Sequence, residues 1–194
     1  MGTRDVILDA AAEVIGEQGL ANVTTRQIAR AAGFTEATLY KHFANKADLL
    51  VAVMRERSPG FGWLGEVLRD KVGTGDVVGN LTAVAEAAIT FYGGGFPMFA
   101  SMFADPETLT AHKEELRRHG VGPHKVNEAV AAYLRAEQQQ GRLRPEADVQ
   151  AAAGLLLGAC FQHAFLGHMS TPEHRDDDDA AAGFARALVE SLAP

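Results

Sequence analysis

Residues 24–48 carry two short helical patterns separated by one glycine, and this stretch constrains the fold more than any other. Thr24 or Thr25 is suited to cap a first helix, whose apolar positions are Ile28, Ala29 and Ala32. Gly33 tolerates the left-handed backbone that ends helices, and a second helix is expected to begin at Thr35. Two helices joined by a short turn that contains glycine predict a helix-turn-helix, a motif whose second helix lies in the major groove of DNA.

The second helix has an apolar side and a polar side. At about 100° per residue, Leu39 and Phe43 fall together and are expected to point into a core. The opposite side and its flanks carry Ala37, Thr38, Tyr40, Lys41 and His42. Hydroxyl, ammonium and imidazole groups suit contacts with phosphates and base edges. Asn45 is suited to cap a third helix, with Lys46 in its first turn within reach of a phosphate. The alternative is an ordinary α-hairpin, which explains the apolar side but not the polar one.

On these residues the chain resembles the TetR family of one-component transcriptional regulators. The segment TTRQIARAAGFTEATLYKHFANKADLL is similar to the DNA-binding region of that family. The helix expected before this segment also fits the family, and it ends at Gly19 and Leu20. Its apolar stripe consists of Val6, Ile7, Ala10, Ala11, Val14 and Ile15. The resemblance is dense over the N-terminal quarter of the chain and faint beyond it.

The resemblance also implies which side chains touch DNA. Thr25 and Arg26 would contact the DNA backbone or bases at the start of the first motif helix. The recognition helix would contribute Thr35, Thr38, Tyr40, Lys41 and His42, and Lys46 would clamp a phosphate. Glu36 departs from the family pattern, in which many members carry a basic or neutral polar residue. Its carboxylate either accepts from a cytosine amine or caps the helix, and capping is the favoured interpretation.

Composition indicates a soluble intracellular protein, and we expect it in the cytoplasm. The 194 residues can form one large or two small domains, and the single cysteine, Cys160, excludes an intramolecular disulfide. The first residues lack the apolar run of a signal peptide. The net charge of −7 argues against DNA binding. Between residues 20 and 46, however, Glu36 is the only acidic residue. The basic residues there are Arg26, Arg30, Lys41 and Lys46, so this segment has a net positive charge.

The rest of the chain shows helical rather than alternating patterns, so the expected fold class is all-α. We expect a helix-turn-helix domain with its linking helix over residues 1–57, and a helical effector-binding and dimerisation domain over residues 58–194. Within the second domain, one helix is expected from about Asp76 to Tyr92, ended by Gly93–Gly95, and the apolar stretch 97–103 is expected to be separate. Further helices are expected from Pro106 and from Pro123 to about Gln140.

Aromatic and thioether side chains crowd around the expected break at Gly93–Gly95. Core packing is one explanation, with methionine filling gaps. The other is the wall of an apolar effector pocket, because a cavity within a helical bundle needs interrupted helices and large rigid side chains. The residues expected to line such a pocket are Trp63, Phe91, Tyr92, Phe96, Phe99, Met102, Phe103, Tyr133, Phe161 and Phe165. The resemblance implies that a small molecule bound there releases DNA.

Two apolar helices are expected at the end of the chain. The segment from Ala147 to about His168 is apolar all round, so it is expected to be buried on more than one face. It is too polar for a confident membrane span, and no membrane contact is expected. The last helix, from Ala180 to Leu192, carries an apolar stripe. Both helices could belong to the core of a monomer. The favoured interpretation is a homodimer interface, because a helix-turn-helix protein needs two half-sites about 34–36 Å apart.

Signatures of catalysis and of metal binding are weak. Cys160 and His163 could form a nucleophilic pair, but a cysteine in an apolar helix is better explained as a packed residue. His112, Glu115 and His119 share one helical face, yet such spacing is frequent by chance. The acidic run at 176–179 lacks the alternation and the glycine of a calcium loop. We therefore expect no enzyme activity, no catalytic residue, no cofactor and no bound metal.

These patterns together predict a homodimeric, ligand-responsive transcriptional regulator, and repression is the expectation from the family. It would bind a palindromic operator in double-stranded DNA and be released by a small apolar or amphipathic effector, with the helix from Lys46 to Arg57 as the linking element. The alternative is a helical small-molecule carrier or enzyme with a vestigial DNA-binding motif. That alternative requires a polar constellation in the pocket, and the sequence offers only scattered His163, His168 and Tyr133.

Overall fold

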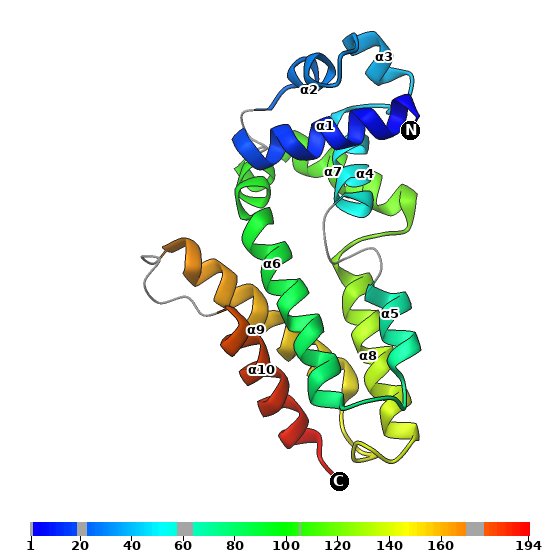
Figure 1. Cartoon of the computed structure of the whole chain (residues 1–194), viewed down its shortest axis with the longest axis vertical. Coiled ribbons are helices and arrows are strands. Elements are labelled where there is room, and N and C mark those ends of the chain that lie inside the picture. Colours follow the sequence, from blue (N-terminus) through cyan, green and yellow to red (C-terminus); the bar gives the residue numbers. More distant parts are fainter. Residues whose placement is uncertain (1, 19–22, 58–63, 105, 170–176) are drawn as a thin grey trace. The chain divides into compact units, whose positions relative to one another are not determined.

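The computed structural model describes residues 2–18, 23–57, 64–104, 106–169 and 177–194. Within these ranges every regular element is a helix, which confirms the all-α fold class (Figure 1). The helices are α1 (Thr3–Gln18), α2 (Thr25–Ala31), α3 (Glu36–Tyr40), α4 (Lys46–Glu56), α5 (Leu64–Lys71), α6 (Val77–Ala104), α7 (Pro106–His119), α8 (Pro123–Gln139), α9 (Val149–Met169) and α10 (Asp177–Leu192).

The chain divides into two compact units. Unit 1 comprises Met1–Ser58 and Gly94–Val121, and unit 2 comprises Pro59–Gly93 and Gly122–Pro194. Unit 1 therefore holds the helix-turn-helix together with the end of α6 and all of α7, which the sequence assigned to the second domain. The functional boundary after residue 57 stays a prediction.

Unit 1 is built around one apolar core. Within it, α1 packs on α2 and α4, α2 packs on α3, and α4 packs on α7. The core residues are Ile7, Leu8, Ala11, Val14, Val23, Ile28, Ala29, Leu39, Phe43, Leu49, Ala52 and Val53. Leu39 of the second motif helix is 0% exposed, and Phe43, which lies beyond the end of that helix at Tyr40, is 2% exposed, so both residues predicted to point inward do so.

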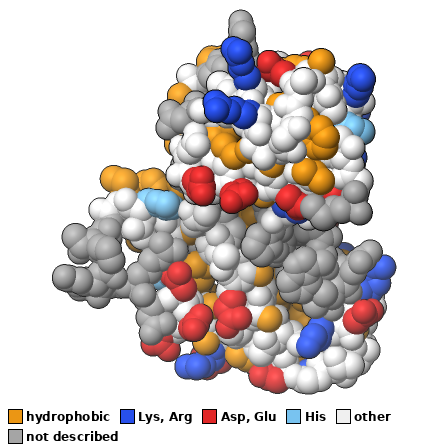
Figure 2. All heavy atoms as spheres, turned by 45° about the horizontal axis from the view of Figure 1, so that its top comes forward, with side chains coloured by type: hydrophobic (Ala, Val, Ile, Leu, Met, Phe, Trp, Pro, Cys, Tyr) orange, Lys and Arg blue, Asp and Glu red, His pale blue; other side chains and the backbone are white. Residues whose placement is uncertain are grey.

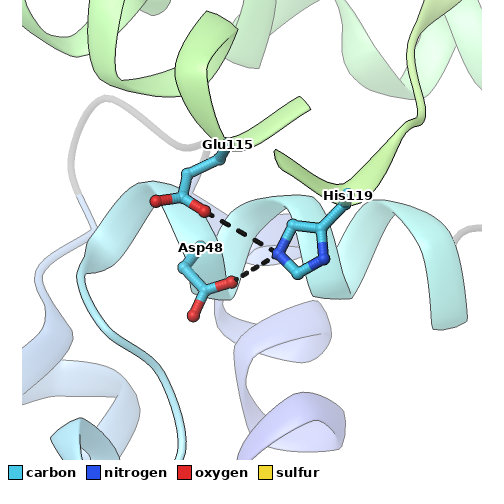
Figure 3. Close-up of side chains that lie close together, drawn as sticks. All are labelled: Asp48, Glu115 and His119. Atoms are coloured by element: carbon cyan, nitrogen blue, oxygen red, sulfur yellow. Dashed lines mark hydrogen bonds and ion pairs between the residues drawn. The ribbon is translucent and has the colours of Figure 1, made fainter. Parts of the chain in front are cut away.

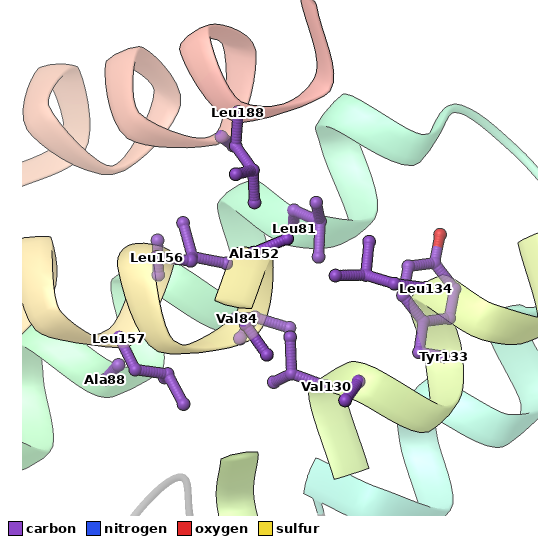
Figure 4. Packing of buried hydrophobic residues seen from close by; sticks show 14 of the residues in the cluster. Leu81, Val84, Ala88, Val130, Tyr133, Leu134, Ala152, Leu156, Leu157 and Leu188 are labelled. Carbon is purple, nitrogen blue, oxygen red and sulfur yellow. The ribbon is translucent and has the colours of Figure 1, made fainter. Parts of the chain in front are cut away.

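Unit 2 has its own core, to which α6, α8, α9 and α10 contribute (Figure 4). The close-up shows Val84 of α6 beside Val130 of α8, and the same cluster includes Leu156 of α9 and Leu188 of α10. The helix predicted from Pro123 to about Gln140 is confirmed as α8, and Gly141 follows it with φ 74°.

The predicted helix break at Gly93–Gly95 is wrong. Helix α6 continues through the three glycines and through Pro97 to Ala104, so the stretch 97–103 belongs to it. Each glycine costs a helix about 1 kcal/mol relative to alanine, which the burial of apolar side chains earlier in α6 exceeds. Pro97 has no N–H to donate to the carbonyl of Gly93, and His168 Nε2 donates to that carbonyl instead, at 2.8 Å.

Helix α9 buries only one stripe of its surface within the chain. The stripe contains Val149, Ala152, Ala153, Leu156, Leu157, Cys160 and Ala164, whereas Leu155, Leu166 and Met169 are 69%, 50% and 73% exposed. The expected burial on more than one face is therefore not met within a single chain. By length and composition α9 could cross a membrane, and 39% of its most apolar window is buried inside the protein.

Candidate DNA interface

The first helix of the motif, α2, is closed at both ends by local hydrogen bonds. Thr24 is the N-cap: its hydroxyl accepts from the backbone N–H of Gln27, and the Gln27 side chain accepts from the Thr24 N–H in return. After the helix, Gly33 adopts φ 75°, and the next N–H, that of Phe34, donates to the carbonyl of Ala29 at 2.8 Å. The short turn predicted around Gly33 is confirmed by these contacts.

The second helix of the motif, α3, presents its polar side to solvent. Thr35 caps it by accepting from the backbone N–H of Thr38, and the two threonine hydroxyls lie 2.9 Å apart. Tyr40 is 46% exposed and Thr38 is half-buried, and the other exposed residues on this surface include Arg26, Arg30, Thr35, Ala37, Lys41 and His42. Figure 2 shows Lys and Arg side chains in the upper part of the view, among uncharged and a few acidic ones. A surface with this chemistry can contact phosphates and base edges.

Thr25 differs from the other predicted contacts. Its side chain is only 7% exposed, and its hydroxyl donates to Glu36 Oε1 and lies 3.3 Å from Tyr40 Oη. A surface contact by this side chain does not fit the structure, because its polar atom is buried against α3. Thr25 instead holds Glu36 and Tyr40 in place. The Glu36 carboxylate lies in the first turn of α3, whereas the cap itself is supplied by Thr35.

Lys46 lies in the first turn of α4 and reaches back to the segment before α2. Its Nζ donates to the carbonyl of Val23 at 2.6 Å. Partial burial of the ammonium group lowers the pKa of Lys46 from its usual value. The predicted Asn45 cap is confirmed, because its side chain accepts from the backbone N–H of Asp48 at 2.8 Å.

The end of α4 is tied to α1 by ion pairs. Arg4 donates twice to the Glu56 carboxylate, at 2.7 and 2.8 Å, and its guanidinium lies 5.3 Å from the centre of the Phe43 ring. Arg57 pairs with Asp9 and Asp5. The hydrogen bond to Glu56 raises the pKa of Arg4, and the one to Asp9 raises that of Arg57. The linking helix and the helix-turn-helix therefore form one packed body in unit 1.

The aromatic residues predicted to line an effector pocket are divided between the two units. In unit 2, Tyr92 contacts Phe91 and Phe161 edge to face, at ring-centroid distances of 5.7 and 5.3 Å, and Phe165 is 43% exposed. In unit 1, Phe96 and Phe99 pack edge to face at 6.4 Å, and Phe103 is 72% exposed. Trp63 and the Met102 side chain lie outside the described residues.

Tyr133 belongs to the core of unit 2 rather than to an open surface. It is 2% exposed, and its hydroxyl accepts from Asn80 Nδ2 at 3.0 Å. Burial raises the pKa of Tyr133 to about 12.

Cys160 and His163 do not form a nucleophile–base pair. The Cys160 side chain is fully buried, and burial raises the pKa of its thiol to about 12, so it is protonated at neutral pH. His163 Nε2 bonds to Asp177 Oδ1 at 2.9 Å.

Two family models match the chain. One describes bacterial regulatory proteins of the tetR family and matches residues 7–53. The other describes the C-terminal domain of AefR-like transcriptional repressors and matches residues 95–192.

Relatives over most of the chain are also regulators. The uncharacterized HTH-type transcriptional regulator YvkB of Bacillus subtilis (strain 168) is 32% identical over 191 residues, which cover 96% of this chain and 97% of YvkB. The fatty acid metabolism regulator protein of the same strain is 27% identical over 160 residues, covering 78% of this chain and 76% of that protein. The solved structure of the transcriptional regulator FadR from Bacillus subtilis in complex with stearoyl-CoA shares the fold, with a TM-score of 0.68 at 21% identity over 97% of this chain and 98% of FadR.

Proposed function

The chain belongs to the tetR family of bacterial regulatory proteins, which are DNA-binding transcriptional regulators, and we propose that it is a cytoplasmic repressor that binds a palindromic operator as a homodimer. The observation that carries the proposal is the exposed polar side of α3, backed by the buried Leu39 and Phe43. In this proposal Arg26, Thr35, Thr38, Tyr40, Lys41 and His42 contact DNA, Lys46 clamps a phosphate, and Thr25 positions Glu36 and Tyr40.

The effector in this proposal is a long-chain acyl thioester or another amphipathic molecule of that kind. One relative is named a fatty acid metabolism regulator, and a solved structure of the same fold contains stearoyl-CoA. In unit 2 the aromatic set of Phe91, Tyr92, Phe161 and Phe165 supplies the apolar contacts that an acyl chain needs.

Dimerisation in this proposal uses the exposed face of α9. Leu155, Leu166 and Met169 expose apolar side chains there, and such a patch is uncommon on a monomer. Gly154 and Gly158 are exposed on the same face, and a Cβ added at either would meet nothing within 4 Å, so another backbone can approach closely.

Release of DNA requires that the effector favour one conformation of the dimer over another. The chain passes between the units after residues 58, 93 and 121, and the second of these crossings lies inside α6. Effector binding in unit 2 would act on unit 1 through these connections and through α4, which directly follows the recognition helix. The mechanism fails if effector-bound and DNA-bound dimers have equal separations between their recognition helices.

The first experiment is selection of bound duplexes from a random DNA pool by the purified full-length protein. An enriched inverted repeat supports a dimeric, sequence-specific regulator and supplies the operator. The absence of enrichment at low salt, with a folded dimer, would favour the carrier or enzyme alternative.

Two further titrations use that operator. Lys41→Ala is expected to weaken binding and to lower the salt dependence by about one counterion, whereas Lys113→Ala, an exposed lysine on α7, is the matched control with no expected effect. Adding stearoyl-CoA is expected to release the operator from the unaltered protein.

A further inference from the structure

Three side chains with metal-binding chemistry meet in unit 1, where α4 packs on α7. Asp48 lies in the first turn of α4, and Glu115 and His119 lie one turn apart in α7 (Figure 3). His119 Nε2 lies 3.0 Å from Asp48 Oδ1 and 3.7 Å from Glu115 Oε2. The close-up shows both carboxylates directed toward the same ring nitrogen.

Glu115 is the most deeply buried member of this cluster. Its side chain is 2% exposed, and its Oε2 atom is buried without a hydrogen-bond partner. A buried carboxylate oxygen without a donor carries a desolvation cost of about 1–3 kcal/mol or more, so it calls for an explanation. The atom is aimed at the place where the other two groups meet, and a cation bound there would satisfy it.

The remaining oxygens of both carboxylates are held by other groups. Glu115 Oε1 accepts from Asn45 Nδ2 at 3.1 Å and pairs with Arg118 at 2.8 Å. Asp48 Oδ2 accepts from the backbone N–H of Ala44 at 2.9 Å. Each carboxylate is therefore oriented through one oxygen and offers the other to the cluster, an arrangement characteristic of supported metal ligands.

The distances suit a small divalent ion. Metal–nitrogen and metal–oxygen bonds of about 2.0–2.2 Å place neighbouring ligand atoms roughly 3–3.5 Å apart, close to the separations of 3.0 and 3.7 Å from His119 Nε2, and all three ligand atoms lie within 4.8 Å of one another. One imidazole with two carboxylates favours a first-row transition metal. A cavity of about 130 Å³ borders two of the three ligands, Asp48 and His119, and is also lined by Arg4 and His42, so it leaves room for water ligands on that side.

We propose that Asp48, Glu115 and His119 bind one divalent transition-metal ion, with Zn²⁺ as the test ion. In the metal-bound form neutral His119 offers the Nε2 lone pair and carries its proton on Nδ1, so the ion takes the place of the hydrogen bond between Nε2 and Asp48 Oδ1. The two carboxylate charges, partly balanced by Arg118, are compensated by the ion. The other explanation for the cluster is an ion-pair clamp between α4 and α7 that needs no metal.

The test is equilibrium dialysis of tag-free, chelator-treated full-length protein against Zn²⁺, with the bound metal measured by mass spectrometry. One Zn²⁺ per chain is expected, together with a higher melting temperature. In His119→Gln the affinity is expected to fall by a factor on the order of 10–100 or more, since one of three ligands is lost.

His124→Gln and Glu114→Gln are the matched controls, because both residues are exposed and lie outside the cluster, and both variants should bind Zn²⁺ like the parent. Circular dichroism checks the folding of each variant, and Asp48→Asn takes the place of His119→Gln if the latter does not fold. No uptake by the parent protein, or equal uptake by parent and ligand variant, would overturn the proposal.

Discussion

At the scale of single residues, Glu36 is the side chain whose role changes most once the structure is considered. Its carboxylate accepts from the buried Thr25 hydroxyl, so it joins α2 to α3 while placing a negative charge near the proposed DNA surface. Two charges about 4 Å apart in water interact with about 1 kcal/mol, roughly a fivefold change in affinity. Glu36→Gln keeps an acceptor for Thr25 and removes the charge, so we expect severalfold tighter binding to duplex DNA.

Fluorescence anisotropy with the operator and with a scrambled duplex, at one salt concentration, measures this effect. Glu13→Gln, an exposed glutamate on α1, is the control. Weaker operator binding with relaxed selectivity at one base pair would instead mean that Glu36 accepts from a cytosine amine.

Tyr133 gives a pH dependence with a definite sign. The folded protein keeps the phenol protonated up to a pKa of about 12, whereas the unfolded chain releases the proton near the ordinary tyrosine pKa of 10.0. The unfolded state therefore binds fewer protons in this window. The stabilisation is fully present below pH 10 and is lost as the pH rises toward about 12.

Tyr133→Phe is expected to weaken this alkaline loss of stability and to cost roughly 0.5–1.5 kcal/mol at neutral pH through the lost Asn80 hydrogen bond. Urea unfolding at neutral pH and within the alkaline window measures both effects. Tyr40→Phe removes a phenol at a 46% exposed position and is the comparison for the alkaline slope alone, because its hydroxyl also contacts Thr25. Identical alkaline slopes for Tyr133→Phe and the parent protein would contradict the prediction.

At the scale of elements, local signals predicted α2, α3 and α4 well, because caps and turn glycines act within a few residues. Each cap accepts from a backbone N–H three positions ahead, and such a contact can be predicted from the sequence. The three caps are Thr24, Thr35 and Asn45. Helix α6 was mispredicted because the packing of its apolar side chains in the folded protein outweighs the cost of its glycines, and because a distant residue, His168, donates to the Gly93 carbonyl. The cluster of Asp48 with Glu115 and His119 was missed for the same reason, since tertiary packing joins α4 to α7.

The glycines of α6 provide a matched pair of substitutions. Gly94 is exposed and a Cβ there would meet nothing within 4 Å, so Gly94→Ala is expected to raise the free energy of unfolding by about 0.5–1 kcal/mol. A Cβ at Gly95 would lie 2.8 Å from Phe99 Cε2, so Gly95→Ala is expected to stabilise less or to destabilise. Denaturant unfolding of both variants measures these changes in the free energy of unfolding. Equal stabilisation by the two would show that the Phe99 ring moves aside freely.

At the scale of the whole molecule, the negative net charge of the chain disfavours the proposed binding to DNA. The chain carries −7, and the exposed basic residues around α3 are few, namely Arg26, Arg30 and Lys41. One such surface supports only weak, salt-sensitive binding. Tight operator binding therefore depends on joining two copies, and the exposed apolar face of α9 is where we propose that they join.

Leu155→Glu tests this dependence, because it places a charge at a 69% exposed position in the middle of that face. We expect a folded protein of half the mass in analytical ultracentrifugation, since burying an unpaired carboxylate opposes association. Operator affinity should then fall by a factor on the order of 10²–10⁴, the gain that two linked half-sites provide. Ala132→Glu adds the same charge at an exposed position of α8 and should leave both the mass and the affinity unchanged. If Leu155→Glu remains a dimer with full affinity, the two copies meet through another surface.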